Sequence, residues 1–154
     1  MANSDEHHIL KADLAGAERA LGVTVKREQS ADEHGRVSRV VTVGLPARVA
    51  VRARFVRESF LRRAEKLFVH EVEVGSAWFD DLIFVITDTR EATATFVAEK
   101  RVQQALILLV DEDRYVQVSE QELRLVDEDA RDDGRDALAE LFALATHLLA
   151  RALP

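Results

Sequence analysis

The sequence predicts an α+β fold: a single domain with a largely antiparallel sheet and with its helices packed on one face. Short stretches that alternate apolar and polar residues follow one another closely, a pattern typical of strands joined as hairpins. Longer stretches with apolar residues at helical spacing separate these strands. The expected order is α-β-β-β-α-β-β-α-β-β-α, and local hairpins with inserted helices are typical of this class.

The first helix is expected to begin near Asn3 or Ser4, either of which can accept hydrogen bonds as an N-cap. Gly22 is expected to end it, since glycine is common just after a helix. The residues that define its apolar face recur at helical spacing: Ile9, Leu10, Leu14, Ala17 and Leu21.

Three strands are expected next. The alternating stretches VTVKRE, from Val23, and VSRVVTVGL, from Val37, flank the polar segment 29–36, which we interpret as a hairpin loop. After Pro46, the segment 48–56 alternates again. Successive side chains of a strand point to opposite faces, so Val49, Val51, Ala53 and Phe55 should share one face, opposite Arg48, Arg52 and Arg54.

The middle of the chain is expected to hold a short helix and two strands. Ser59 can cap a helix over 59–68, and 70–74 alternates as a strand does. Residues 82–87 form an unbroken apolar run, which predicts a central strand covered on both sides.

The last third is expected to hold helical segments around one hairpin. Thr89 can cap the stretch 90–111, which predicts one bent helix or two helices joined near Glu99. A hairpin over 115–126 turns at SEQE. The closing helix has a broad apolar stripe that predicts a core face: Leu138, Leu141, Phe142, Ala145, Leu148 and Leu149.

The composition is that of a soluble globular protein. The 154 residues suit one domain over 1–154, with a possible subdivision near Phe68. There is no cysteine, which excludes disulfides and thiolate metal sites. We expect a cytoplasmic protein without a membrane span, because no stretch approaches the length of about 20 apolar residues that a span needs.

Charge is distributed unevenly along the chain. The net charge of −7 argues against nucleic acid as a partner, because phosphate binding depends on Lys and Arg. Residues 48–66, however, hold seven basic and two acidic residues, whereas 111–136 holds eleven acidic and four basic ones. The basic segment supplies a candidate partner surface: Arg52, Arg54, Arg57, Arg62, Arg63 and Lys66.

No catalytic, cofactor or metal site is assigned from the sequence. Residues 129–140 are spaced like a calcium-binding loop, but Arg131 stands where a ligand is needed. The five histidines lack the spacing of a zinc site, and no glycine-rich phosphate loop or nucleophile elbow is present. Two carboxylate pairs, Glu71 with Glu73 and Asp80 with Asp81, could serve acid–base chemistry only in a pocket that shifts their pKa values.

One stretch combines the single Trp with two adjacent carboxylates: GSAWFDDLIFVI, residues 75–86. Gly75 permits a turn, Trp78 and Phe79 can anchor it by burial, and Asp80 can cap it. We therefore interpret Gly75, Trp78, Phe79 and Asp80 as a structural motif that leads into a strand.

The stretch VEVGSAWFDDLIFVI, the helical FVAEKRVQQALILLV, the hairpin YVQVSEQELRLV and the closing helix together resemble a bacterial family of soluble domains of unknown function. Its motif has the form G-D-x-x-F-D-x-x-F-x-V, and the resemblance covers roughly 37–153. Ser76 stands where the family has Asp, and Trp78 precedes the motif Phe. The resemblance implies a fold and no activity. The element order is also similar to that of secretion chaperones and related adaptors, which bind partner peptides and usually dimerise.

These observations favour a non-enzymatic interaction or adaptor module that self-associates or binds a protein partner through a charged face or an exposed sheet edge. The alternative is an enzyme or small-ligand-binding protein with a pocket between the sheet and the last helix. A third hypothesis places an anionic partner on the basic segment, with binding that weakens as salt rises.

Overall fold

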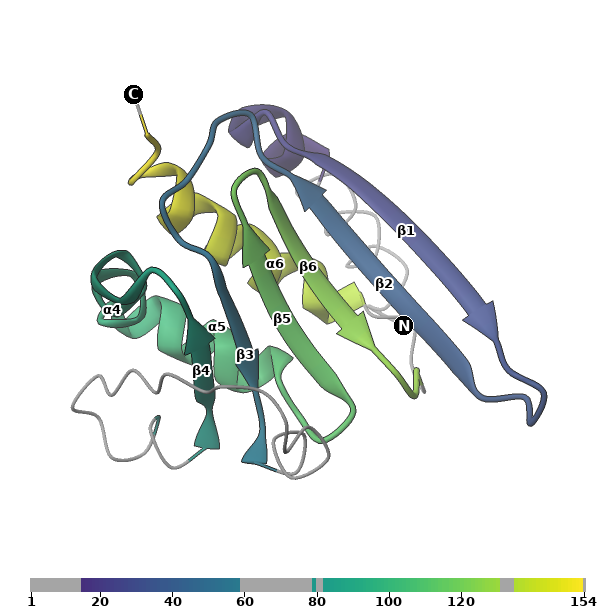
Figure 1. Cartoon of the computed structure of the whole chain (residues 1–154). Coiled ribbons are helices and arrows are strands. Elements are labelled where there is room, and N and C mark those ends of the chain that lie inside the picture. The colour runs from purple at the N-terminus through teal and green to yellow at the C-terminus, as the bar shows by residue number, and fades with distance from the viewer. Residues whose placement is uncertain (1–14, 59–78, 80–81, 131–134, 154) are drawn as a thin grey trace, which may run out of the picture.

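A computed structural model describes residues 15–58, 79, 82–130 and 135–153. Its centre is a six-stranded antiparallel sheet with the order β1-β2-β6-β5-β3-β4, and α5 and α6 lie behind it (Figure 1). The α+β prediction is thus confirmed. Residues 15–21 are also helical, and the other elements are β1 (Thr24–Ala31), β2 (Val37–Gly44), β3 (Ala53–Val56), β4 (Phe84–Thr87), α4 (Arg90–Val97), α5 (Lys100–Leu109), β5 (Arg114–Ser119), β6 (Glu122–Asp127) and α6 (Arg135–Leu149).

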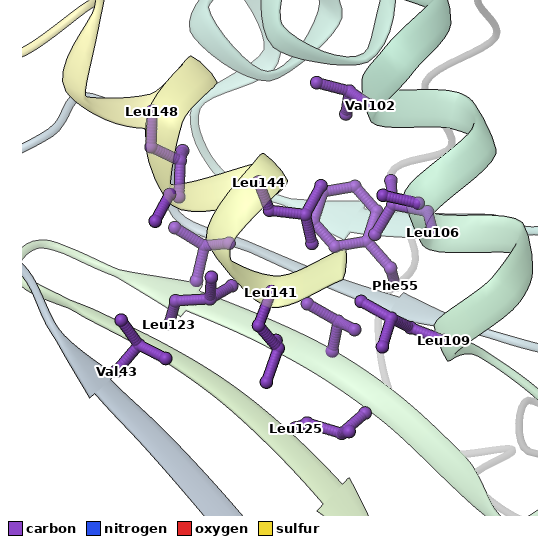
Figure 2. Close-up of a cluster of buried hydrophobic side chains, with 14 of the residues drawn as sticks. Val43, Phe55, Val102, Leu106, Leu109, Leu123, Leu125, Leu141, Leu144 and Leu148 are labelled. Atoms are coloured by element: carbon purple, nitrogen blue, oxygen red, sulfur yellow. The ribbon is translucent and has the colours of Figure 1, made fainter. Parts of the chain in front are cut away.

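The core lies between one face of the sheet and the two helices α5 and α6 (Figure 2). Leu141 and Leu148 of α6 are fully buried, as the predicted apolar stripe requires, and Leu144, which the prediction did not include, is fully buried as well. Burying a side chain of this size contributes about 1.5–3 kcal/mol. The sheet and α5 contribute the side chains that α6 faces: Val43, Phe55, Leu123, Leu125, Val102, Leu106 and Leu109.

The hairpin of β5 and β6 forms as predicted. Ser119 pairs with Glu122 at its end, so Glu120 and Gln121 make the turn. The carbonyl groups of both turn residues accept hydrogen bonds of 2.8 Å from the N–H groups of Leu45 and Val49. The turn therefore holds the connection that leads from β2 to β3.

The loop predicted over 29–36 is wrong in its extent. β1 continues to Ala31, which pairs with Val37, and the loop shrinks to Glu33–Gly35. Gly35 has a φ of 77°, the left-handed conformation that closes three-residue hairpins. Residues 29–31 have a weak intrinsic preference for strands, which is why the sequence predicts a loop there. Cross-strand hydrogen bonds to β2 outweigh this weak preference.

The strand predicted over 48–56 is also shorter than expected. β3 covers Ala53–Val56 only, while Val49 forms a single bridge with Ala152 after the end of α6. The alternation itself is correct, since Val49 and Val51 are buried and Arg52 is exposed. The chain departs from the sheet here because the C-terminal tail and Thr89 take over its hydrogen bonds.

Residues 82–87 do not form a strand covered on both sides. β4 covers Phe84–Thr87 and ends the sheet order among the described strands, and its residues alternate between buried and partly exposed. Phe84 and Ile86 lie on the face of β4 away from the helices and are only partly buried, whereas Val85 and Thr87 on the other face are buried. Both faces of this run are therefore largely apolar, but only the face toward the helices is fully covered.

The helical stretch after β4 is divided, which selects the second of the two expected forms. α4 ends at Val97 and α5 begins at Lys100, with Glu99 between them. Thr89 occupies the N-cap position of α4, but its hydroxyl makes no capping hydrogen bond. It accepts instead from the N–H of Arg52 at 2.9 Å and lies 3.1 Å from the hydroxyl of Thr93.

Several predicted elements lie outside the described residues, as do Ile9, Leu10 and Leu14 of the first helix's apolar face. These predictions are the cap at Asn3 or Ser4, the helix over 59–68, the strand over 70–74 and the subdivision near Phe68.

Candidate functional site

The predicted basic surface is only partly described, and its described members have different roles. Arg62, Arg63 and Lys66 lie outside the described residues. Arg52 forms a 2.9 Å ion pair with Asp88. Arg54 lies over the ring of Tyr115, with its guanidinium carbon 5.5 Å from the ring centre.

Arg57 is the third described member of that surface. Its Nε donates to the carbonyl oxygen of Val110 at 3.1 Å, and its side chain is partly buried. Arg57 thus ties the end of β3 to the end of α5. The described arginines act at separate places, each with a local contact.

The structural motif is described only at Phe79. Gly75, Trp78 and Asp80 lie outside the described residues, as do Glu71, Glu73 and Asp81. Phe79 is fully buried, and its carbonyl oxygen accepts a 2.9 Å hydrogen bond from the N–H of Ile83. The role of the motif as a turn that leads into a strand stays a prediction.

The calcium-like spacing over 129–140 is also partly described. Asp129 lies 3.8 Å from the guanidinium of Arg36, which lies 3.9 Å from Asp113. Within the described ranges, no group of three or more acidic or histidine side chains is arranged to hold a metal ion. The carboxylate of Asp129 instead faces the guanidinium of Arg36, on the β1–β2 hairpin.

A hollow of about 340 Å³ lies between residues 49–51, α4 and the end of α6. Its walls are mainly aliphatic, from Val49, Val51 and Leu148, and charged groups of Glu91 and Arg151 border it. Arg151 also forms a 2.9 Å ion pair with Glu99. The lining suits a small apolar group. The guanidinium of Arg151 beside it is neutralised by Glu99.

β1 has the most exposed residues of the described strands. Seven of its eight residues are exposed, and Val25 is half-buried. β1 lies at one end of the sheet order, paired with β2. In the part of the chain that the structure describes, no strand pairs with its other side.

The hairpin turn shows which backbone groups of β1 point outward. Asp32 N–H donates to the carbonyl oxygen of Arg36 at 2.9 Å, so these residues form a hydrogen-bonded pair. Such pairs alternate with non-hydrogen-bonded pairs along an antiparallel ladder. Even-numbered residues of β1 therefore bond to β2, whereas four residues direct N–H and C=O groups to the free edge: Val25, Arg27, Gln29 and Ala31.

Side-chain hydrogen bonds also close the turn at the end of β1. The Oδ1 atom of Asp32 accepts hydrogen bonds from the N–H groups of His34 and Arg36, at 2.9 and 2.8 Å. These two bonds satisfy donors that would otherwise face solvent in a polar loop. β1 is thereby presented as an extended strand up to its last residue.

Charged side chains mark the centre of this strand. Lys26 and Glu28 lie on the same face and form a 2.9 Å ion pair, with both side chains well exposed. The hydrogen bond and the charge of Glu28 raise the pKa of Lys26 above its usual value. The same contact lowers the pKa of Glu28. Arg27 lies on the other face, opposite Val41.

Lys26 also begins a row that crosses the face of the sheet away from α5 and α6. The pairing register places Lys26, Thr42 and Arg124 side by side on β1, β2 and β6. Gln117, Arg54 and Ile86 continue the row on β5, β3 and β4. The row includes three cations, and only Arg54 belongs to the basic surface that the sequence predicted.

We found no family model, no curated protein and no solved structure that matches the chain. The resemblance to a bacterial family, based on Gly75, Phe79 and Asp80, therefore stays a prediction. In the described ranges no helix has the length and apolar character needed to cross a membrane.

Sequence reasoning placed a strand from Val23 but did not single out its edge. Alternation identifies a strand and its faces, whereas the neighbours of that strand depend on pairing across the chain. The available signal was the cluster of Lys26, Arg27 and Glu28, because charged residues are common on strands at sheet edges.

Proposed function

We propose that the protein is a non-enzymatic interaction module that accepts an extended strand of a partner, or of itself, at the free edge of β1. The observation that carries this proposal is the eight-residue exposed edge with four residues whose backbone groups point outward. Adding a strand to such an edge satisfies those groups and gives affinity through main-chain hydrogen bonds.

The charges on β1 give the edge selectivity. Charged side chains at an edge prevent indiscriminate pairing with other strands. A strand with an acidic residue opposite Lys26 and a basic residue opposite Glu28 would be favoured, because unlike charges on opposing residues stabilise a strand pair. The partner is therefore a charged strand. We place this activity in the cytoplasm, where a chain without cysteine needs no disulfide.

Amide hydrogen exchange tests the proposal. The probes are raised protein concentration and a set of ten-residue peptides that alternate Val or Thr with charges complementary to Lys26 and Glu28. We expect slower exchange at Val25, Arg27 and Gln29, whose amides point outward, and unchanged exchange at the even-numbered residues that already bond to β2.

A proline variant supplies the matched control. Gln29→Pro removes an outward N–H and blocks strand addition, so the protection should disappear, whereas Gln29→Ala should retain it. Exchange that stays at the unprotected rate under all these conditions would overturn the proposal.

The hollow beside α6 favours a second candidate function, the binding of a small apolar ligand. A volume of about 340 Å³ with aliphatic walls is within the lower range of ligand sites. The probe is the dye 1-anilinonaphthalene-8-sulfonate. Ala92→Phe, which fills the hollow, should abolish a fluorescence increase seen with the native chain; dye binding that survives this change would exclude the site.

A further inference from the structure

The geometry of β1 points to a second copy of this chain as its partner. We propose that the two β1 strands pair antiparallel with Arg27 opposite Arg27, so that the two six-stranded sheets continue into one. This inference rests on the proposed strand-accepting function and names its partner.

Symmetry restricts the registers that are possible. In a two-fold dimer each surface meets its own copy, and residues directly opposite each other in an antiparallel pair lie on the same face of the sheet. The residue at the centre must therefore face itself. The longest symmetric pairings are centred on Arg27 or Glu28 and include seven residues of β1, whereas a centre at Lys26 or Gln29 includes only five. The charged centres to compare are Lys26, Arg27 and Glu28.

Charge selects among these three registers. A centre at Lys26 sets two lysines opposite each other, and a centre at Glu28 does the same with two carboxylates. In both cases the like charges occupy a non-hydrogen-bonded pair, in which side chains are closest. Like charges directly opposite each other destabilise a strand pair.

The register centred on Arg27 forms two unlike pairs and moves the single like-charged pair, Arg27 with Arg27, to the more widely spaced type of position. Lys26 of each copy lies opposite Glu28 of the other, in the closely spaced type of pair. Arg27 meets Arg27 in the wider, hydrogen-bonded pair, on the other face of the strand, where exposed guanidinium groups can diverge into water. The hydrogen bond and charge of Lys26, and to a smaller extent the charge of Arg124, lower the pKa of Glu28.

The backbone groups fit the same register. Val25, Arg27 and Gln29 direct their N–H and C=O groups outward, and the register pairs Val25 with Gln29 on both sides of the central Arg27. Three hydrogen-bonded pairs supply about six backbone hydrogen bonds. Helices of both copies then lie on the same side of one continuous sheet.

Cysteine cross-linking tests the register directly, because the native chain has no cysteine. In the proposed dimer the two copies of residue 27 have Cα atoms about 5.5 Å apart, within the range of about 4.4–6.8 Å that a disulfide allows. The two copies of residue 29 are offset by four residues, or roughly 14 Å along the strands. Arg27→Cys should cross-link under mild oxidation, and Gln29→Cys should not.

The readout is a non-reducing gel together with light scattering, which distinguishes the 17.3 kDa monomer from a species of twice that mass. Cross-linking of Arg27→Cys should be at least about tenfold faster than that of Gln29→Cys, given the difference in separation. Equal rates in the two variants, or no cross-link in either, would overturn the proposal.

Charge reversal provides a second readout in which no cysteine is introduced. Lys26→Glu and Glu28→Lys each replace two unlike pairs by two like pairs, so the Kd of the dimer should rise about tenfold or more. The double variant Lys26→Glu/Glu28→Lys restores both unlike pairs and should recover the native Kd. A double variant as weak as the single ones would contradict the register.

The outcomes also separate this inference from the function on which it rests. If the chain stays monomeric while a complementary peptide protects the amides of Arg27 and Gln29, the second copy is excluded and the strand-accepting edge is retained. If neither a second copy nor a peptide protects them, both proposals fail.

Discussion

The strands at the centre of the sheet differ from β1, at its margin, in how much of their surface is buried. At the centre, β5, β6 and β3 lie beneath α5 and α6, and their inward side chains are almost fully buried. At the margin, β1 has exposed residues along nearly its whole length. Burial makes the centre a source of folding free energy. The β1 edge contributes little to this free energy. Substitutions at the centre should therefore lower stability, whereas substitutions on β1 should chiefly change association with a partner.

The largest expected effect is that of a cavity at the centre. Phe55 is fully buried and lies against Phe96, with 6.3 Å between the ring centres. Phe55→Ala should lower the free energy of unfolding by about 3–5 kcal/mol, because a cavity remains where the ring was. Urea denaturation measures this. Arg27→Ala on β1 is the matched control and should change stability by less than about 0.5 kcal/mol; similar losses in both variants would remove the contrast.

The buried threonine cluster should show the next effect. Thr93 is fully buried, and its hydroxyl lies 2.9 Å from that of Thr87 and 3.1 Å from that of Thr89. Thr93→Val should cost up to about 1.5 kcal/mol, the net contribution of buried hydrogen bonds, because the hydroxyls of Thr87 and Thr89 keep their backbone partners.

The control for this cluster lies on the same helix. Thr95 is exposed and donates to the carbonyl oxygen of Glu91 at 2.9 Å, within α4. Thr95→Val should be nearly neutral in the same denaturation experiment. A larger loss at Thr95 than at Thr93 would show that burial does not determine the importance of these hydroxyls.

A smaller effect is expected at the turn that shapes β1. Asp32→Ala removes the acceptor of two backbone hydrogen bonds, and should cost about 1 kcal/mol. Amide exchange should accelerate at the β1–β2 end near the turn more than at β5 or β6. Asp32→Asn keeps an acceptor oxygen and should retain most of the protection. Uniform acceleration across the sheet would indicate that the turn stabilises the whole fold.

The smallest effect concerns the titration of β1. Lys26 lowers the pKa of Glu28 through a hydrogen bond and its charge, so Lys26→Ala should move that pKa up toward 4.5, its ordinary value. The ion pair supports the folded state above pH 4.5 and loses this effect as pH falls through the lowered pKa of Glu28.

The opposite limb of the titration follows from Lys26. Its raised pKa means that the contribution is complete below 10.5 and is lost as pH rises further. The net effect on stability is small because both groups are exposed. NMR titration of the Glu28 side chain measures the shift, and an unchanged pKa in Lys26→Ala would contradict the assigned cause.

Much of the fold could be predicted because its signals are local. The apolar stripe of α6 follows from helical spacing, and Leu141 and Leu148 are buried as expected. Gly22 ends the first helical stretch with a φ of 70°, as a glycine after a helix should. The extents of β1 and β3 were not predictable, since pairing with other segments decides them, as in the pairs Ala31 with Val37 and Val49 with Ala152.

The candidate site was less accessible to prediction. Arg52, Arg54 and Arg57 were grouped by their proximity in sequence, but Asp88, Tyr115 and Val110 engage them separately. Basic residues that are close in sequence do not necessarily form one binding surface, because residues from other elements contact each long side chain separately.

By itself, the sequence determined which residues alternate, which follow a helical period and which side of each element is apolar. These properties depend on backbone geometry within a few residues. Only the tertiary structure decided that β2 pairs with β6 and thereby leaves β1 at the margin. Strand order depends on which apolar faces can be buried together beneath α5 and α6, and that choice involves residues far apart in the chain. The exposed edge is a consequence of that global packing.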